Sequence, residues 1–215
     1  MPKKDLIIRQ LELGPLSNFV YILGDPDTKE ACVIDPAWDT DAIKKTLENE
    51  KFKLKFIILS HHHFDHSGGL KDLVDKAENG AYIHEADLGE LEDTAGSVKK
   101  IPKNGKIKLG GIEIECLHTP GHTQGSVCII AGNNIFTGDT LFVRACGRVD
   151  LPGSDPEKMY MSLKKLMDLD DNLTVWPGHN YGPAKSMSLK IEKEQNPFLR
   201  LGASSKEDFL RTMGG

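Results

Sequence analysis

Four histidines and an aspartate directly follow a short apolar run, and this arrangement constrains the fold more than any other feature. The run Lys53–Leu59 is rich in β-forming residues and stops at Ser60. The residues that follow it are His61, His62, His63, Phe64, Asp65 and His66. A cluster of imidazoles directly after a strand predicts a functional site at the end of that strand, because histidine is scarce and titrates near neutrality.

Side-chain alternation sorts the members of this cluster. In an extended chain His61, His63 and Asp65 share one side, and the turn that follows brings His66 round to them. His62 faces the other way and is expected on the surface or behind the other histidines. Imidazole and carboxylate ligands suit zinc, iron and related ions, so the cluster predicts a metal site.

Three later turns have the same form, in which an apolar strand leads into a tight turn and then a ligand-type residue. Leu117–Thr123 offers His118 and His122, Ile135–Thr140 offers Asp139, and Val175–His179 offers His179. Each turn is a weak signal alone. Counted with one ligand from each turn, they and the cluster (His61, His63, Asp65 and His66) give seven candidate ligands from four strand ends. Seven ligands suit two metals about 3.5–4 Å apart, with the two oxygens of Asp139 as the natural bridge.

Composition excludes other classes of protein. The 215 residues carry 27 basic and 32 acidic side chains, a net charge of −5, which disfavours nucleic acid or an anionic membrane as partner. No apolar run approaches the ~20 residues that span a bilayer, and the first residues show no secretory signal, so a cytoplasmic protein is expected. Its four cysteines form no CxxC pair. The oligomeric state is not indicated.

Hydrophobic periodicity predicts a chain of the α/β (α+β) class. Strands are expected at Leu6–Leu13, Asn18–Leu23, Ala31–Ile34, Lys53–Leu59, Tyr82–His84, Ile107–Leu109, Ile112–Leu117, Val127–Ile130, Ile135–Phe136 and Leu173–Trp176. Helices are expected at Asp39–Glu50, after Gly69, after His84 to about Asp93, at Pro156–Met167 and at Ala184–Glu194. From Asn196 onward only a short tail is expected. No linker or repeat appears, so residues 1–215 are expected to form a single domain.

The ordered motifs resemble those of the metallo-β-lactamase superfamily, over about Asn18 to Phe198. They are His-x-His-x-Asp-His at His61–His66, then Gly-His-Thr, Thr-Gly-Asp-Thr and Pro-Gly-His at Gly121, Thr137 and Pro177. The nearest likeness is to the glyoxalase II (hydroxyacylglutathione hydrolase) branch. The resemblance implies a four-layer αβ/βα sandwich with the metals at the shared edge of two sheets. Flavodiiron proteins, true β-lactamases and the nucleases depart from this chain in a ligand residue or in an added domain.

The resemblance also implies roles for individual residues. The first of two divalent metal ions would be held by His61, His63 and His122. The second would be held by Asp65, His66 and His179, with Asp139 as the bridge. Asp35 would orient the ligands, and His118 falls outside the pattern. Arg148 and Tyr181 match positions that contact glutathione in the family, although a packed loop residue is the plainer interpretation of Tyr181.

The implied reaction is hydrolysis of a hydroxyacylglutathione-like thioester by a metal-bridging hydroxide, with Asp65 and Asp139 as catalytic residues and zinc, iron or manganese as metal. The alternative is an iron-dependent persulfide dioxygenase. The segments Arg144–Asp150 and Asn196-Pro197 also resemble that branch of the superfamily. A third alternative is a metal-binding protein without catalysis. Because 36 residues follow His179 (215 − 179), the helical C-terminal domain that grips glutathione in classical glyoxalase II is expected to be missing. The substrate is therefore expected to be a small thioester or thiol derivative, with glutathione one candidate for its thiol half.

Overall fold

The computed structural model describes residues 6–91 and 97–213, and two six-stranded sheets dominate it. The first sheet has the order β1-β2-β3-β4-β5-β6. Its strands are β1 (Ile7–Leu13), β2 (Asn18–Gly24), β3 (Glu30–Ile34), β4 (Lys53–Ile58), β5 (Ala81–Ile83) and β6 (Val98–Lys100). The pairs β1–β2 and β2–β3 are antiparallel, and the pairs from β3 to β6 are parallel.

The second sheet has the order β14-β13-β10-β9-β8-β7. Its strands are β7 (Lys106–Leu109), β8 (Ile112–His118), β9 (Val127–Ala131), β10 (Asn134–Gly138), β13 (Thr174–Pro177) and β14 (Met187–Ser188). Only the β10–β13 pair is parallel among the described strands of this sheet. A small ribbon of β11 (Leu141–Phe142) and β12 (Ala145–Cys146) stands beside it.

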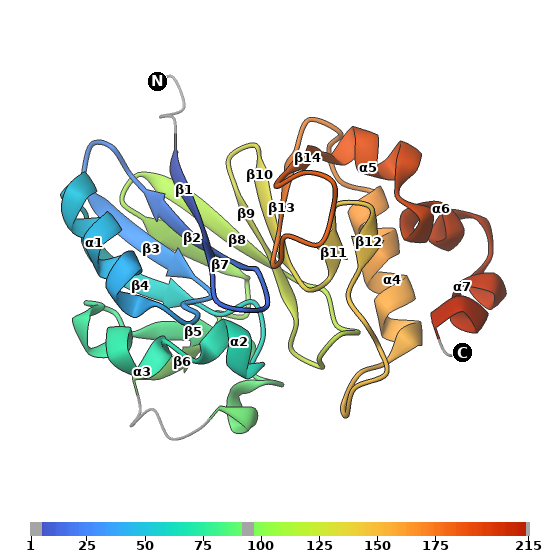
Figure 1. Cartoon of the computed structure of the whole chain (residues 1–215), viewed down its shortest axis with the longest axis horizontal. Coiled ribbons are helices and arrows are strands. Elements are labelled where there is room, and N and C mark those ends of the chain that lie inside the picture. The colour runs from blue at the N-terminus through green and yellow to red at the C-terminus, as the bar shows by residue number, and fades with distance from the viewer. Residues whose placement is uncertain (1–5, 92–96, 214–215) are drawn as a thin grey trace.

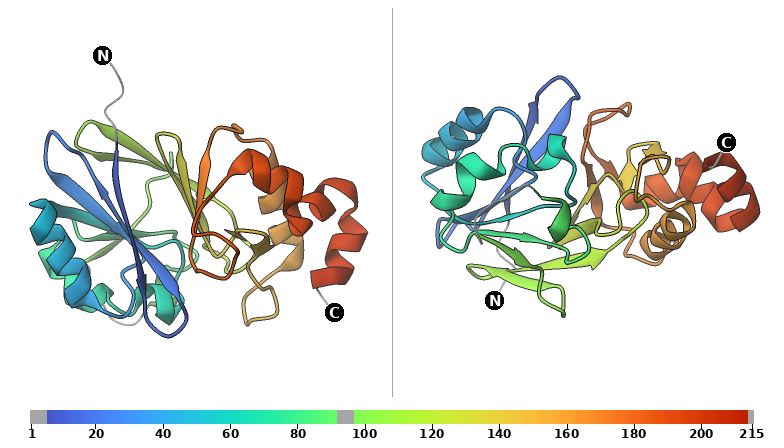
Figure 2. Two further views of the ribbon diagram at one scale, coloured as in Figure 1. Left: turned by 45° about the horizontal axis from the view of Figure 1, so that its top comes forward. Right: turned by 90° about the horizontal axis from the view of Figure 1, so that it is seen from below.

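Helices cover the outer face of each sheet (Figure 1). One set is α1 (Thr40–Glu50), α2 (Phe64–Ser67) and α3 (Leu70–Leu73), with 3₁₀ turns at Val74–Lys76 and Leu88–Glu90. The other set is α4 (Pro156–Met167), α5 (Leu189–Gln195), α6 (Pro197–Ser204) and α7 (Lys206–Met213). Figure 2 shows the two sets on opposite outer sides with the sheets between them. This is the metallo-β-lactamase fold, as the sequence resemblance implies.

Strand β2 shows how sequence builds these layers, since all seven of its residues are buried. Phe19, Tyr21 and Leu23 lie in the core between the sheets, where the Tyr21 ring meets Phe136 with centroids 4.8 Å apart. Val20 and Ile22 lie in the core beneath the helices of the first half. A strand covered on both faces needs a continuous apolar run rather than an alternating one.

Helices α1 and α4 begin within one residue of the positions expected from the sequence, and each has an aspartate as its N-cap. Asp39 accepts a hydrogen bond from the backbone N–H of Ala42 at the start of α1. Asp155 does the same for Lys158 at the start of α4, and Pro156 occupies the first turn. Both side chains satisfy backbone donors that a helix start leaves unpaired.

Several expectations about elements are wrong. The helix expected from Ala184 begins only at Leu189, because Met187 and Ser188 pair with β13 and Ser188 then caps Ile191. The helix expected up to Asp93 is a single 3₁₀ turn at Leu88–Glu90 among the described residues, and positions 92–96 lie outside them. Strand β6 was not expected.

The expected short tail instead forms α6 and α7. Asn196 accepts hydrogen bonds from Phe198 and Leu199 at the start of α6, directly before Pro197, so a cap signal was present in the sequence. Phe209 of α7 is fully buried against the second half. Among the described residues, no helix is long and apolar enough to cross a membrane.

Candidate metal centre

Four chain segments deliver polar side chains to one edge shared by both sheets. They follow β4, β8, β10 and β13, and carry His61–His66, His122, Asp139 and His179. Backbone hydrogen bonds join the sheets at this edge, from Val127 to Ser60 (2.9 Å) and from Phe19 to Gly178 (2.8 Å). Strand ends of two sheets therefore meet at one place, as the sequence resemblance implies.

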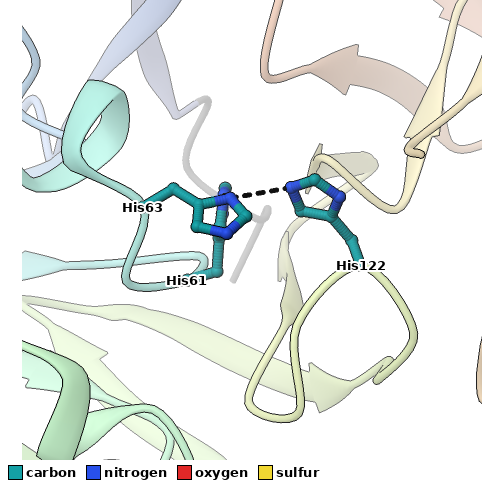
Figure 3. Close-up of side chains that lie close together, drawn as sticks. All are labelled: His61, His63 and His122. Atoms are coloured by element: carbon teal, nitrogen blue, oxygen red, sulfur yellow. Dashed lines mark hydrogen bonds between the residues drawn. The ribbon is translucent and has the colours of Figure 1, made fainter. Parts of the chain in front are cut away.

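Group A consists of His61, His63 and His122 (Figure 3). Nδ1 of His63 lies 3.1 Å from Nε2 of His61 and 3.0 Å from Nε2 of His122. His61 and His122 are buried, and His63 is partly exposed. Three ring nitrogens turned toward one point are a donor set that suits zinc or iron.

Group B consists of Asp65, His66 and His179. The Nε2 atoms of His66 and His179 lie 3.1 Å apart, and Oδ2 of Asp65 lies 3.6 and 3.4 Å from them. Both histidines are buried. The turn after β4 thus divides its residues between the two groups, with His61 and His63 in one and Asp65 and His66 in the other.

Asp139 lies between the groups. Its Oδ2 is 3.4 Å from Nε2 of His122 in group A and 3.4 Å from Nε2 of His179 in group B. Its Oδ1 is 3.3 Å from Nε2 of His66, yet it is buried without any hydrogen bond. A buried carboxylate oxygen without a hydrogen bond is costly unless another group satisfies it. The residues therefore fit a pair of bound cations.

Gly178 makes the close approach of Asp139 possible. A Cβ at this position would lie 2.5 Å from Oδ1 of Asp139 and 2.9 Å from the backbone of Gly138. Any side chain would push apart the ends of β10 and β13. The glycine of the Pro-Gly-His motif is thus explained by packing against the carboxylate.

The second nitrogen of each buried histidine is also engaged, which fixes its ring. The partners are Ser60 Oγ for His61, Asp35 Oδ2 for His66, the Arg148 carbonyl for His122 and the Leu16 carbonyl for His179, at 3.0, 3.0, 2.8 and 2.9 Å. Such contacts orient a metal-binding imidazole and set which nitrogen faces the metal. Asp35 also accepts hydrogen bonds from the backbone and hydroxyl of Ser60, each 2.6 Å long.

Burial and the charges within the site shift the pKa values of several of its residues. Burial and neighbouring histidines hold the pKa of His61 well below its ordinary value and lower that of His63 to about 4. Burial opposes the charges of His66 and Asp139, but their mutual attraction outweighs it. The pKa of His66 accordingly lies well above its ordinary value, and that of Asp139 well below. Neutral His61 and His63 and ionised Asp139 are in the forms that bind metal, whereas a cation bound beside His66 would have to displace the proton that Asp139 and Asp35 favour on its ring.

The remaining predicted residues lie around this centre. Arg148 is largely exposed and forms two 2.6 Å hydrogen bonds to Asp150. Tyr181 is 56% exposed, and its ring stacks on His179 with centroids 4.5 Å apart. His118 stacks on His84, away from both groups, consistent with its exclusion from the pattern.

Sequence reasoning missed Asp87, which is buried beside group A. It accepts hydrogen bonds from the backbone of His62, the hydroxyl of Thr123 and the backbone of Gly125 (3.1, 2.8 and 2.6 Å). It thereby joins the turn that carries His61 and His63 to the loop that carries His122. With His62 and Thr123 it lines a cleft of about 200 Å³. No motif marks Asp87, because its partners come from distant segments.

Asn18 was also missed. Its side-chain amide donates to Oδ2 and to the carbonyl of Asp65 (3.0 and 2.9 Å), and its own oxygen accepts from the indole N–H of Trp38 (2.7 Å). Asn18 therefore fixes the carboxylate of group B. Asn18 is the first residue of β2, and nothing in its local sequence marks it as a partner of Asp65.

Comparison with known proteins identifies the family. The model of the metallo-β-lactamase superfamily matches residues 13–179, so the chain belongs to this superfamily. The matched segment contains every residue of groups A and B together with Asp139.

Some of the relatives carry functional names. A probable polyketide biosynthesis zinc-dependent hydrolase, PksB of Bacillus subtilis, is 29% identical over 196 residues, covering 91% of this chain and 86% of the relative. A probable hydroxyacylglutathione hydrolase of Schizosaccharomyces pombe is 35% identical over 177 residues, covering 79% of this chain and 66% of the relative.

Solved structures agree with the fold. ETHE1 from Myxococcus xanthus superimposes with a TM-score of 0.85 at 29% identity, covering 97% of this chain and 90% of that one. TTHA1623 in a di-iron-bound form gives a TM-score of 0.75 at 30% identity, covering 88% and 99%. The chain is thus a metal-dependent hydrolase of the superfamily with a histidine-rich site. The glyoxalase II branch is not distinguished from its neighbours by these likenesses.

Proposed function

We propose that the protein is a thioester hydrolase with two metal ions, acting on substrates like the hydroxyacylglutathiones. Group A and group B would each hold one divalent ion, and Asp139 would bridge them. The position of Asp139 is the observation that carries this proposal. Its two oxygens face both groups, and Oδ1 is buried without a hydrogen bond.

Zinc is the proposed metal, and iron or manganese would fit the same donors. The zinc-dependent relative supports zinc, and the di-iron neighbour supports a pair of ions in this fold. Bound at this edge, two such ions supply an activated water and polarise the thioester carbonyl.

Residues of the chain supply the remaining functions. Asp65 presents Oδ2 toward His179 while Asn18 holds it in place, so this carboxylate can accept a hydrogen bond from the attacking water and orient it. Asp35, Ser60 and the carbonyls of Leu16 and Arg148 keep the imidazoles in one orientation. The leaving thiolate is stable near neutral pH and needs little help from a general acid.

The substrate assignment rests on two further residues. Arg148 could pair with a substrate carboxylate, because its guanidinium is exposed and already grips a carboxylate in Asp150. Tyr181 offers a phenol beside His179 that could donate to a substrate amide. The S. pombe relative's name supports a hydroxyacylglutathione-like substrate.

The test is anaerobic hydrolysis of S-D-lactoylglutathione by protein loaded with zinc or manganese, followed as loss of thioester absorbance. Chelated protein is the first control, and His118→Ala is a matched histidine variant outside the site. Metal-dependent turnover without oxygen supports the proposal. Absence of turnover with two metals bound contradicts it and favours the iron-dependent persulfide dioxygenase, for which oxygen uptake with glutathione persulfide is the assay. Inactivity in both assays favours a non-catalytic metal-binding protein.

A further inference from the structure

Exposed apolar side chains gather on one side of the metal centre. Within residues 6–91 and 97–213, the large apolar side chains that are exposed are Leu16, Trp38, Phe64, Met161 and Tyr181. All but Met161 belong to segments that hold or contact group B. We call Leu16, Trp38, Phe64 and Tyr181 the apolar rim.

Phe64 and Trp38 form one part of the rim. Phe64 directly precedes Asp65 at the start of α2 and is 69% exposed. Its ring meets that of Trp38 edge to face, with centroids 5.9 Å apart. The indole N–H of Trp38 donates to Asn18, which holds Asp65. The pair is therefore attached to the carboxylate of group B.

Leu16 and Tyr181 form the other part. Leu16 lies in the turn between β1 and β2, and its carbonyl accepts a hydrogen bond from Nδ1 of His179. Tyr181 stacks on the ring of the same histidine. The Trp38 ring joins the two parts, because it lies so close to Gly14 that a Cβ there would be 2.3 Å from it. Figure 1 places this turn beside α2.

The backbone beneath the rim is held in a rarely used conformation. Trp38 has a φ of 54° and Ser17 a φ of 53°, both in the left-handed region that bulky side chains avoid. Strained residues of this kind persist where the surrounding structure fixes them, and they concentrate at ligand sites. This backbone conformation of Trp38 places its indole beside group B, where it remains partly exposed.

The other side of the centre carries hydrogen-bonding groups. The cleft beside group A is lined by His62, Asp87, Glu90, Thr123 and Gln124 together with Ala86, Pro152 and Gly153, and Arg148 is tied to this side through His122. A thioester whose carbonyl lies between the groups would therefore meet apolar surface in one direction and polar groups in the other. Apolar surface that remains exposed beside a catalytic centre marks a ligand contact.

We propose that the apolar rim binds an apolar acyl chain, so that the preferred substrates are thioesters of alkyl or aryl acids with a polar thiol half. This inference rests on the proposed thioesterase function and names the acyl half of its substrate. Leu16 and Phe64 are the specificity-determining residues, since neither side chain holds a metal ligand. Burying a methylene favours binding by roughly a factor of 3–4, and on an open rim about a factor of 2 is expected.

The first experiment measures kcat/KM for S-acetyl-, S-butyryl- and S-hexanoylglutathione. The native protein should gain about twofold for each added methylene. The double variant Leu16→Ala/Phe64→Ala should lose most of this gain, with the loss growing with chain length. Met161→Ala, which changes an exposed residue on α4, is the matched control and should keep the native increase in kcat/KM per methylene. The inference is overturned if kcat/KM of the native protein does not rise with acyl chain length, or if the double variant loses the same factor in kcat/KM for all three acyl groups. Either result leaves thioester hydrolysis itself in place.

The second experiment does not depend on turnover. The chain has two tryptophans, and Trp176→Phe leaves Trp38 as the only indole reporter. Titration of this metal-loaded variant with S-hexylglutathione should shift the Trp38 emission at concentrations about thirtyfold lower than with S-methylglutathione, which has five fewer methylenes. Equal affinity for the two thioethers contradicts the inference even if the protein hydrolyses thioesters. Failure to hydrolyse any thioester, with tighter binding of the hexyl compound, contradicts the proposed function alone.

Discussion

Oδ2 of Asp35 accepts a hydrogen bond from Nδ1 of His66 across 3.0 Å, although 31 residues separate the two in the chain. Both side chains are buried, and Asp35 has a φ of 52°. The same carboxylate binds the backbone and hydroxyl of Ser60, so it fixes the first turn after β4 as well as the ring of His66. The strained backbone of Asp35 is thus explained by its position under the candidate metal centre.

The first prediction concerns this contact. Asp35→Asn removes a carboxylate that orients His66, and loss of such a partner typically costs about 10–100-fold in metal affinity. Metal content after dialysis against a graded chelator measures the effect. Asp41→Asn, an exposed carboxylate on α1, serves as the control. Native affinity in Asp35→Asn would show that His66 needs no such support.

The second prediction concerns the bridge. Asp139→Asn replaces one carboxylate oxygen by an amide nitrogen that cannot ligate, so the two ions would lose their bridging ligand. We expect turnover to fall at least about a hundredfold, since metal stabilisation of the reacting carbonyl amounts to several kcal/mol. The measurement is kcat at saturating metal, with His118→Ala as the matched control. Full activity in Asp139→Asn contradicts the bridging role.

The third prediction concerns Asp87. In Asp87→Asn an amide N–H₂ must face donors from His62, Thr123 or Gly125, which leaves at least one of them unsatisfied in a buried place. The loops that carry group A should then separate, and metal affinity at group A should fall while group B retains its ion. Titration of metal stoichiometry should change from about two ions to about one, as expected for a two-site centre that loses one site.

Glu90→Gln provides the control for Asp87, because Glu90 lines the same cleft but is exposed. Equal loss at both metal sites in Asp87→Asn would indicate general unfolding instead of a local effect. The unfolding temperature of each variant distinguishes these outcomes.

The fourth prediction concerns Arg148. Removing its guanidinium should raise KM for a carboxylate-bearing thioester several-fold and change kcat less, because the contact would be remote from the reacting carbon. Arg211→Ala is the matched control, since Arg211 is also exposed and paired with an aspartate, Asp208. An unchanged KM in Arg148→Ala would remove this residue from the substrate site.

The fifth prediction concerns metal removal. A ligand present at a thousand times its dissociation constant stabilises the folded state by about 4 kcal/mol. For a chain of this size, chelation should therefore lower the unfolding temperature by about 8–16 °C. The double variant His61→Ala/His179→Ala should be insensitive to chelator, because both groups have lost a ligand. Calorimetry measures the unfolding temperature of the native protein and of the double variant, each with and without chelator.

Local sequence determined the secondary structure wherever pattern and cap agreed. Asp39 and Asp155 stand directly before segments with helical periodicity and cap them, so α1 and α4 begin within one residue of the expected positions. The apolar run after Asn18 predicted a strand, and in the structure this strand is buried on both faces. The errors fall where tertiary pairing overrides local preference. Residues Met187 and Ser188 form a strand because β13 lies beside them, and α7 is held by burial of Phe209.

Sequence alone also indicated which residues gather at the candidate metal centre, because imidazoles clustered at strand ends are typical of metal sites. All seven predicted ligand residues lie in groups A and B or at Asp139. Only the tertiary structure decided how the site is supported and what surrounds it. Asn18, Asp87 and the apolar rim act through partners far away in the chain, and such contacts exist only once two sheets meet at a common edge. Motifs record short-range spacing, whereas the orientation of each ligand depends on long-range packing.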